Sequence, residues 1–181
     1  LITPSASGAD GQDLRFSIVS GQGPAHGLLS PLVPLTCCTA TVTYTPDANY
    51  FGPDSFKFRA NDGFANSNDA TVSITVNGVN DAPSFIAGAD QTVNEDAGAE
   101  TVSNWATLIS AGPGETQTLT FTVSNDNNAL FSSQPAISPT GTLTYTPAAD
   151  ANGSATVSVF LMDDGGTANG GDDTSGQQQF T

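Results

Sequence analysis

The stretch VTYTPDAN at residues 42–49 decides the fold, because it returns as LTYTPAAD at residues 143–150. It opens with alternating apolar and polar residues and is bounded by Pro and Asp or Ala, which is typical of a short half-buried antiparallel strand. A second pair repeats in the same order, with LRFSIVS at residues 14–20 matching LTFTVS at residues 119–124. The offsets of 101 and 105 residues predict two copies of one roughly 100-residue fold.

Other short runs alternate with the same period of two, including residues 56–58 and residues 71–76. No stretch of ten or more residues has sustained helical spacing. Residues 104–109 can form one helical turn, or a loop in which Trp105 plugs the end of a sandwich. The pattern therefore predicts an all-β chain of two tandem antiparallel β-sandwich domains.

The joint between the copies is the polar segment that follows residue 76, which contains Gly and Pro. It divides the chain into a first β-sandwich repeat at residues 1–78 and a second at residues 79–181. The first copy has only 15 residues before Phe16, whereas the matching Phe121 of the second lies 38 positions after Pro83. We therefore expect the first repeat to lack about one N-terminal strand.

The second repeat is expected to stop inside its last strand, because residues 179–181 match only the beginning of residues 71–76. An unpaired sheet edge is a template for pairing with another chain. Two explanations stay open for the missing pieces. Flanking residues of a longer tandem array complete the edges, or a neighbouring subunit does so by strand addition.

The charge balance excludes several classes of partner. The chain of 181 residues has 18 acidic and 3 basic residues, a formal net charge of -15. Three bases cannot build a groove for phosphates, so nucleic acid is not an expected partner, and an anionic membrane surface is disfavoured for the same reason. No apolar run approaches the roughly 20 residues of a membrane-spanning helix, so direct membrane insertion is not expected.

Catalysis is not expected either. The single histidine, His26, lies in a turn context, and the nucleophile motif Gly-x-Ser-x-Gly does not occur. Carboxylates are plentiful, but they fall in turn phrases. The adjacent Cys37 and Cys38 are too few for a zinc site, since His26 is the only histidine. They can close a strained vicinal disulfide, pair with other chains, or stay free thiols.

Several phrases together resemble the bacterial cadherin-like or immunoglobulin-like tandem repeats of large secreted adhesins and repetitive surface proteins. They are TYTPDANYFGPDSFKFRANDG at residues 43–63, VNDAP at 79–83, VNEDAG at 93–98 and DDGGTANGGDD at 163–173. The joint also resembles the calcium-binding linker of cadherins, Asp-x-Asn-Asp-Asn-x-Pro, although Gly78 replaces its first acidic residue. The resemblance implies a cadherin/immunoglobulin-like sandwich at a bacterial cell surface, with neighbouring repeats or subunits as partners.

Calcium is the expected cofactor, because Ca²⁺ takes six to eight oxygen ligands from carboxylates, carbonyls and amides. Asn80 and Asp81 at the joint, with Glu95 and Asp96 shortly after, supply such oxygens. The family's geometry implies that two residues of the first repeat can approach the same place, Asn61 and Asp62. The acidic segment supplies a further candidate set: Asp163, Asp164, Asp172 and Asp173. In each case the alternative is that Asp and Asn only make turns.

These observations predict a calcium-stiffened extracellular spacer in a bacterial adhesin, stalk or filament. Like-charge repulsion would splay the joint, and a divalent ion bridging carboxylates would remove that repulsion. Two alternatives stay open. One is a module that binds glycans or proteins through its loops, for which Tyr50 and Phe51 are the adjacent aromatic pair. The other is a self-assembling filament subunit joined by strand complementation.

Overall fold

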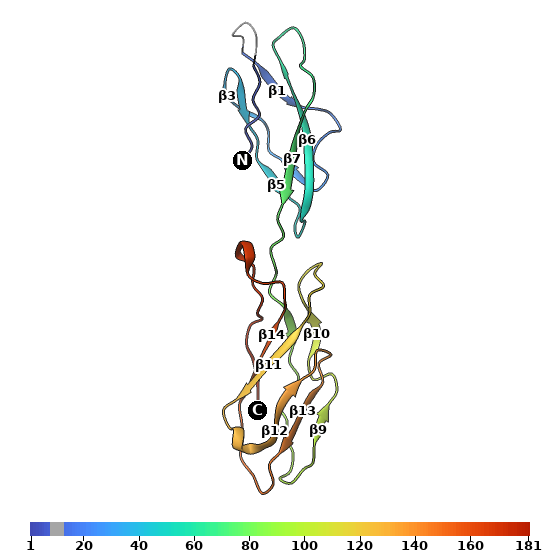
Figure 1. The fold of residues 1–181 in the computed structure, drawn as a ribbon, viewed down its shortest axis with the longest axis vertical. Helices are drawn as coiled ribbons and strands as arrows, with labels where there is room; N and C mark the ends of the chain where they lie inside the picture. The colour runs from blue at the N-terminus through green and yellow to red at the C-terminus, as the bar shows by residue number, and fades with distance from the viewer. Residues whose placement is uncertain (8–12) are drawn as a thin grey trace. The chain divides into compact units, whose positions relative to one another are not determined.

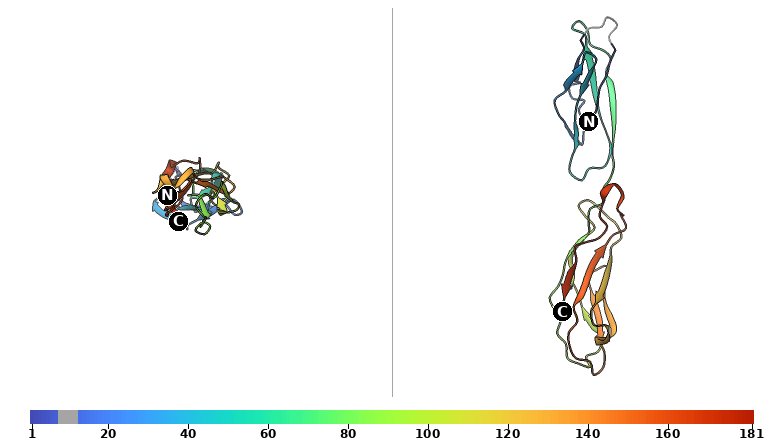
Figure 2. Two further views of the ribbon diagram at one scale, coloured as in Figure 1. Left: turned by 90° about the horizontal axis from the view of Figure 1, so that it is seen from below. Right: turned by 90° about the vertical axis from the view of Figure 1, so that its left-hand side faces the viewer.

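The protein is represented by a computed structural model that describes residues 1–7 and 13–181. The chain divides into two compact units, Leu1–Gly78 (unit 1) and Val79–Thr181 (unit 2). Both units are built from short β-strands in antiparallel pairs, as Figures 1 and 2 show. The described residues contain two 3-10 turns, η1 (Asn128–Leu130) and η2 (Ala168–Gly170), but no α-helix, so none could cross a membrane. The predicted all-β class is confirmed.

Unit 1 is organised around its long strand β6, which lies between β1 and β7. Two smaller sheets, β2–β5 and β3–β4, complete the unit. Its strands are β1 (Arg15–Ile18), β2 (Gly27–Leu29), β3 (Val33–Thr36), β4 (Thr39–Thr41), β5 (Tyr44–Pro46), β6 (Gly52–Asn61) and β7 (Ala70–Val76).

The core of unit 1 follows from the period-two alternation along β6. Asp54, Phe56, Phe58 and Ala60 are buried, while the residues between them are exposed or half-buried. The ring of Phe56 is only 1% exposed, and apolar side chains of β1, β2 and β7 pack on this row. Deleting a buried ring of this kind typically costs about 3–5 kcal/mol, so the β6 pattern fixes which face of the sheet points inward.

Unit 2 repeats this arrangement around β14, which lies between β11 and β15. A second three-stranded sheet has the order β12–β13–β9, and β8 pairs with β10. The strands are β8 (Ser84–Ile86), β9 (Glu100–Val102), β10 (Thr107–Ser110), β11 (Thr120–Asn125), β12 (Phe131–Ile137), β13 (Leu143–Pro147), β14 (Val157–Met162) and β15 (Gln178–Phe180).

Trp105 closes the core of unit 2 from a loop rather than from a helix. Its side chain is 3% exposed, and its ring centroid lies 4.6 Å from that of Phe180. The indole N–H donates to the carbonyl of Ala89 at 3.1 Å. The sequence allowed a helical turn or a plugging loop for residues 104–109; the loop forms only over residues 104–106, and residues 107–109 belong to strand β10.

The chain ends are paired within their own units. Ile2 and Val42 exchange both backbone hydrogen bonds, at 2.9 and 3.0 Å, and Ser5 forms a bridge with Thr39. These contacts are isolated bridges beside β4, and β1, the first strand among the described residues, begins at Arg15. The expected lack of about one N-terminal strand in the first repeat stays a prediction. At the other end, β15 pairs with β14 from Gln178 to Phe180.

The repeated tyrosine occupies corresponding strands in the two units, but its hydroxyl has different surroundings. Tyr44 on β5 is half-buried and donates to Asp54 Oδ2 at 2.8 Å. Asp54 also accepts the backbone N–H groups of Ala25, His26 and Ser55 at 2.8–3.0 Å. Desolvation alone would raise the pKa of Asp54, but these hydrogen bonds outweigh it and lower the pKa to about 2.

In unit 2 the residue that corresponds to Asp54 is Ala155, which is buried. The Tyr145 hydroxyl is therefore buried without a hydrogen-bond partner among the described residues. Its ring packs edge-on against Phe131, with centroids 6.1 Å apart. Burial raises the pKa of Tyr145, and the negative charge of Glu100 on the paired strand β9 raises it further.

Asp54→Asn should make unit 1 less stable at neutral pH and remove a pH dependence. Because the folded pKa of about 2 lies below the ordinary value near 3.9, the carboxylate stabilises unit 1 above about pH 4. This contribution is lost as the pH falls from about 4 to 2. Urea titrations followed by the amide NMR signals of Phe56 and Phe58 measure it. An equal acid-induced loss in Asp54→Asn would contradict the assignment.

The two tyrosines should respond oppositely to loss of the hydroxyl. Tyr44→Phe should destabilise unit 1, because Asp54 loses a donor. Tyr145→Phe should leave the free energy of unfolding of unit 2 unchanged or raise it by up to about 1 kcal/mol, since an unpartnered buried hydroxyl is removed. Fluorescence of Trp105, the single tryptophan, reports unit 2 directly. A clear destabilisation by Tyr145→Phe would show that its hydroxyl has a partner.

Candidate functional site

Asn80, near the start of unit 2, lies at the centre of a cluster of oxygen atoms. Its Nδ2 donates to Asp163 Oδ1 at 2.9 Å and to the carbonyl of Asp172 at 2.7 Å. Its Oδ1 accepts a hydrogen bond from Gln117 Nε2 at 2.7 Å. We call Asn80, Gln117, Asp163 and Asp172 the Asn80 cluster. One amide side chain thereby links three segments that are distant in sequence.

Strand pairing brings the members of the Asn80 cluster together. Asp163 follows β14 directly, and Gln117 lies three residues before Thr120, the first residue of β11. Because Thr120 pairs with Met162, these two chain segments leave the sheet side by side. Next to them, Asp164 accepts the N–H of Thr118 at 2.8 Å, which lowers the pKa of Asp164.

The glycines of the segment 163–173 make room for Asn80. A side chain on Gly165 would collide with the Asn80 amide, and one on Gly171 would press on the Asn80 backbone. The N–H of Asp172 also donates to the Asn80 carbonyl at 3.1 Å. The close approach of Asn80 thus explains Gly165 and Gly171 of this acidic loop.

A neighbouring contact fixes Asp81. Its N–H donates to Glu115 Oε1 at 3.2 Å, and Gly112 provides the space for both side chains. Asn80 and Asp81 are therefore both fastened to unit 2. Neither Gln117 nor Glu115 was recognised from sequence, because no local motif marks the loop before β11.

The Asn80 cluster contains two oxygen atoms that accept no hydrogen bond from the described residues. Asp163 Oδ2 and Gln117 Oε1 are shielded from solvent without a hydrogen-bond partner among the described residues. The Asn80 Nδ2 group occupies the position between Asp163 Oδ1 and the Asp172 carbonyl. Rotating this amide would present oxygen in place of nitrogen, and a cation would then be needed to hold the oxygens together. Within residues 1–7 and 13–181, no three acidic, His or Cys side chains form a ready-made metal site.

Glu95 and Asp96 lie at the other end of unit 2. Asp96 Oδ1 accepts the N–H of Asp150, and Asp150 lies before the start of β14. Asp163 lies just after the end of β14. Six residues of strand, about 20 Å at 3.3 Å per residue, separate these ends. The sequence analysis grouped Asp81 with Glu95 and Asp96, but the structure does not bring them together.

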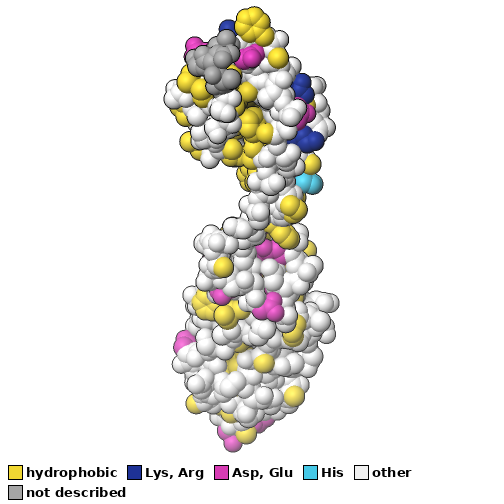
Figure 3. Space-filling model, turned by 45° about the horizontal axis from the view of Figure 1, so that its top comes forward, with side chains coloured by type: hydrophobic (Ala, Val, Ile, Leu, Met, Phe, Trp, Pro, Cys, Tyr) yellow, Lys and Arg dark blue, Asp and Glu magenta, His cyan; other side chains and the backbone are white. Residues whose placement is uncertain are grey.

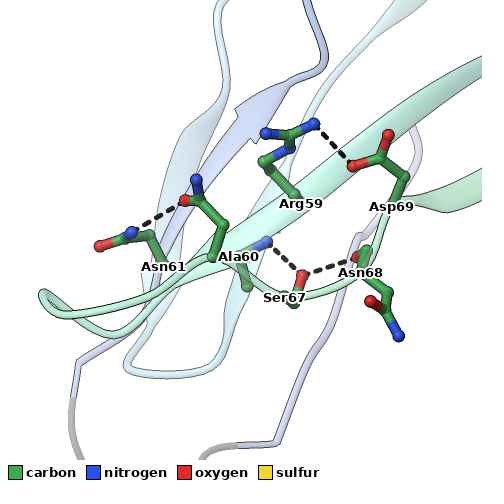
Figure 4. A network of polar contacts seen from close by, with 7 residues as sticks. Arg59, Ala60, Asn61, Ser67, Asn68 and Asp69 are labelled. Carbon is green, nitrogen blue, oxygen red and sulfur yellow. Dashed lines mark hydrogen bonds and ion pairs between the residues drawn. The ribbon is translucent and has the colours of Figure 1, made fainter.

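Asn61 is the last residue of β6, and Asp62 begins the turn that leads to β7. Asp62 Oδ1 accepts the N–H groups of Ala65 and Phe64 at 2.8 and 2.9 Å, which lowers the pKa of Asp62. Asn61 Nδ2 donates to Asn66 Oδ1 at 2.8 Å in the network of Figure 4. The same network includes the ion pair Arg59–Asp69 and the bond from Ala60 N–H to Ser67 Oγ.

This turn lies far from the residues that lead to unit 2. Gly52, at the start of β6, pairs with Val76, and Asn61 lies at the opposite end of the strand. The separation along β6 is about 30 Å at 3.3 Å per residue. Within unit 1, Asn61 and Asp62 therefore do not approach Val76 as the resemblance implied.

The remaining candidates make local contacts. Asp172 Oδ1 accepts the N–H of Thr174, and Asp173 Oδ1 accepts the Thr174 hydroxyl. His26 stacks on Tyr50 with ring centroids 4.1 Å apart. Its backbone N–H donates to Asp54 Oδ2, and its carbonyl accepts from the Tyr44 hydroxyl. The ring of His26 therefore packs on Tyr50, and its backbone bonds to the residues around Asp54.

Charge is distributed unequally between the units. All three basic residues, Arg15, Lys57 and Arg59, belong to unit 1, and the dark blue side chains of Figure 3 lie on it. Unit 2 carries 12 of the 18 acidic residues and no base. The Asn80 cluster is therefore compensated by N–H donors and not by Lys or Arg.

Asn80→Ala should destabilise unit 2 by about 1–3 kcal/mol, because it removes a hydrogen bond to the half-buried Asp163 carboxylate and another to the exposed Asp172 carbonyl. Asn94→Ala is the matched control, since Asn94 is exposed, and it should change stability by no more than about 0.5 kcal/mol. Urea unfolding followed by Trp105 fluorescence compares the two. Equal stability of both variants would show that the Asn80 cluster contributes nothing.

Comparison with known proteins gives two partial sequence relatives, both from Dictyostelium discoideum. Integrin beta-like protein E is 56% identical over 46 residues, 25% of this chain and 2% of that protein. Integrin beta-like protein B is 33% identical over 88 residues, 44% of this chain and 4% of that protein. The chain thus spans only a few per cent of the length of these curated relatives.

Among solved structures, an endo-fucoidan hydrolase of glycoside hydrolase family 107 aligns with 94% of this chain and 23% of that chain. The sequence identity is 20% and the TM-score is 0.33, so nothing about activity follows from this likeness.

A family model described as the bacterial Ig domain matches residues 1–75 and residues 80–172. One match lies in each unit, and together they cover nearly the whole chain. This confirms the resemblance to bacterial immunoglobulin-like tandem repeats. The chain belongs to the bacterial Ig domain family.

Proposed function

We propose that the chain is a structural spacer, a tandem pair of immunoglobulin-like repeats in a bacterial extracellular surface protein such as an adhesin, stalk or filament. The observation that carries this proposal is the pair of family matches on consecutive sandwiches. Each sandwich has its own apolar core, so each is a self-contained module of the kind that repeats in series.

The Asn80 cluster gives the spacer a means of fixing its joint. Asn80 and Asp81 are the second and third residues of unit 2, and both are held by side chains of that unit. Fewer residues at the boundary are then free to rotate, which is what stiffness requires. The hydrogen bonds through Asn80 therefore act as the anchor of the joint on unit 2.

Calcium strengthens this anchor in our proposal. The candidate ligands are Asp163 Oδ2, Gln117 Oε1 and the Asp172 carbonyl, with Asn80 Oδ1 after rotation of its amide. These are the oxygen types that Ca²⁺ takes, and waters complete its coordination. Unit 2 has no basic residue, so a divalent cation is the available counter-charge for its carboxylates.

The loop-binding alternative receives less support. It requires aromatic side chains gathered in one loop cluster. Phe51 and Phe64 are 65% and 89% exposed, but they flank opposite ends of β6. Tyr50 is half-buried and stacked on His26. No aromatic loop cluster therefore forms among the described residues of unit 1.

Calcium should raise the stability of unit 2 through the Asn80 cluster. Extracellular calcium modules bind with Kd of about 10⁻⁴ to 10⁻³ M, and calcium at about ten times Kd adds about 1.4 kcal/mol per site. The measurement is urea unfolding by Trp105 fluorescence, in calcium and in chelator. Asp163→Asn should abolish the calcium effect, whereas Glu95→Gln, at the other end of unit 2, should keep it.

Two results would count against the calcium site. Identical unfolding curves of the wild-type protein in calcium and in chelator would exclude ion binding. Loss of the calcium effect in Glu95→Gln but not in Asp163→Asn would move the site to the other end of unit 2. Small-angle scattering tests the spacer itself: calcium should narrow the distribution of particle dimensions, and an unchanged distribution would exclude ion-dependent stiffening.

A further inference from the structure

Cys37 and Cys38, the two cysteines of the chain, form the two-residue loop between β3 and β4. Thr36 and Thr39 are register partners on either side of this loop, and their hydroxyls hydrogen bond at 2.7 Å. Cys38 N–H donates to Thr36 Oγ1 at 3.3 Å. These hydrogen bonds hold the two ends of the loop together next to the cysteine side chains.

Turn chemistry does not explain why cysteines occupy this loop. Two-residue hairpin loops favour Gly, Asn and Asp because their usual turn types need positive φ angles. Neither Cys37 nor Cys38 has a positive φ. Cysteine brings no turn preference of its own, so the distinguishing property of this loop is its pair of thiols.

The two thiols are placed to react with each other. Their Sγ atoms lie 2.9 Å apart and share a hydrogen bond. Cys37 is exposed and Cys38 is half-buried, so a small reagent can reach the pair. A disulfide bond is about 2.05 Å long, so a modest further approach of the sulfurs joins them. We propose that Cys37 and Cys38 form a redox-active dithiol, which low-molecular-weight disulfides such as glutathione disulfide oxidise to an intramolecular vicinal disulfide.

The reaction is a pair of thiol–disulfide exchanges. The thiolate of one cysteine attacks glutathione disulfide, forms a mixed disulfide and releases one glutathione thiolate. The second cysteine thiolate attacks the protein sulfur of that mixed disulfide and releases the second glutathione. The two protons of the protein thiols end on the two glutathione thiols. The dithiol loses two electrons, and glutathione disulfide gains them.

The bond is expected to reopen easily. Adjacent Cα atoms lie about 3.8 Å apart, which is shorter than the 4.4–6.8 Å usual between disulfide-bonded residues. A disulfide forced away from this geometry is more easily reduced. The pair therefore cycles with the redox state of its surroundings and does not act as a permanent cross-link.

Closing the ring also acts on the backbone around it. The carbonyl of Cys37 accepts the N–H of Leu14 at 2.7 Å, and the carbonyl of Cys38 accepts the N–H of Ala6 at 3.1 Å. The loop thus holds two parts of the N-terminal region. A change of its conformation on oxidation alters the protection of these two amides.

The proposal is tested with the reduced chain of residues 1–181 and glutathione disulfide, read by intact-protein mass spectrometry. The expected product has lost two hydrogen atoms, has no free thiol and is monomeric. The hydrogen bond to Cys38 raises the pKa of Cys37, so the reaction should speed up as the pH rises from 7 to 9. Dithiothreitol should restore both thiols, and amide exchange at Ala6 and Leu14 should differ between the two forms.

Cys37→Ser and Cys38→Ser are the matched controls, each leaving one thiol. Each should stop at a glutathione adduct, which shows that the remaining thiol reacts but has no partner. The amide signal of Phe56 in β6 checks that unit 1 of each variant is folded. The proposal is overturned if the wild-type chain carries two glutathiones, forms disulfide-linked dimers, or keeps both thiols under conditions that modify the single variants.

Discussion

The inward-facing row of one central strand determines the structure of each unit. β6 pairs with both β1 and β7, and β14 pairs with both β11 and β15. Because side chains alternate across a strand, a slip of one residue would turn Lys57 inward and Phe56 outward. The apolar row thus sets the register of both neighbouring strands, and the turns and loops take their places from that register. The Asn80 cluster depends on it as well, since the pairing of Thr120 with Met162 brings Gln117 and Asp163 together.

The two units stabilise the same kind of sandwich with different side chains. Unit 1 has few large buried side chains, and the Asp54 carboxylate joins β5, β6 and the loop before β2 through its donors. Unit 2 has Trp105, a larger buried cluster and Ala155 in place of Asp54. Unit 2 keeps the tyrosine hydroxyl, on Tyr145, but not the carboxylate to which the Tyr44 hydroxyl donates in unit 1. A repeated sequence phrase therefore predicts a strand reliably, but it does not predict the hydrogen bonds of the strand.

The fold could be predicted from the sequence because alternation and repetition are local signals. The site could be predicted only in part. Asn80 and Asp163 were named as calcium ligands in separate sets, and the structure joins them. Glu95 is only 15 residues from Asn80, but the chain crosses the length of the sandwich between them, so nearness in sequence misled. Gln117 gave no local signal, because only the register of β11 with β14 places it beside Asn80.

The acidic surface of unit 2 follows from how its carboxylates are satisfied. Seven of them accept backbone N–H groups instead of pairing with Lys or Arg: Asp90, Asp96, Glu115, Asp126, Asp163, Asp164 and Asp172. Such bonds fix the loops but leave the net negative charge of unit 2 uncompensated. Salt weakens the repulsion between these carboxylates, with a screening length of about 10 Å at 0.1 M. Salt breaks no Lys or Arg ion pair in unit 2, because this unit contains neither residue. Backbone donors thus let unit 2 keep defined loops although it contains no basic residue.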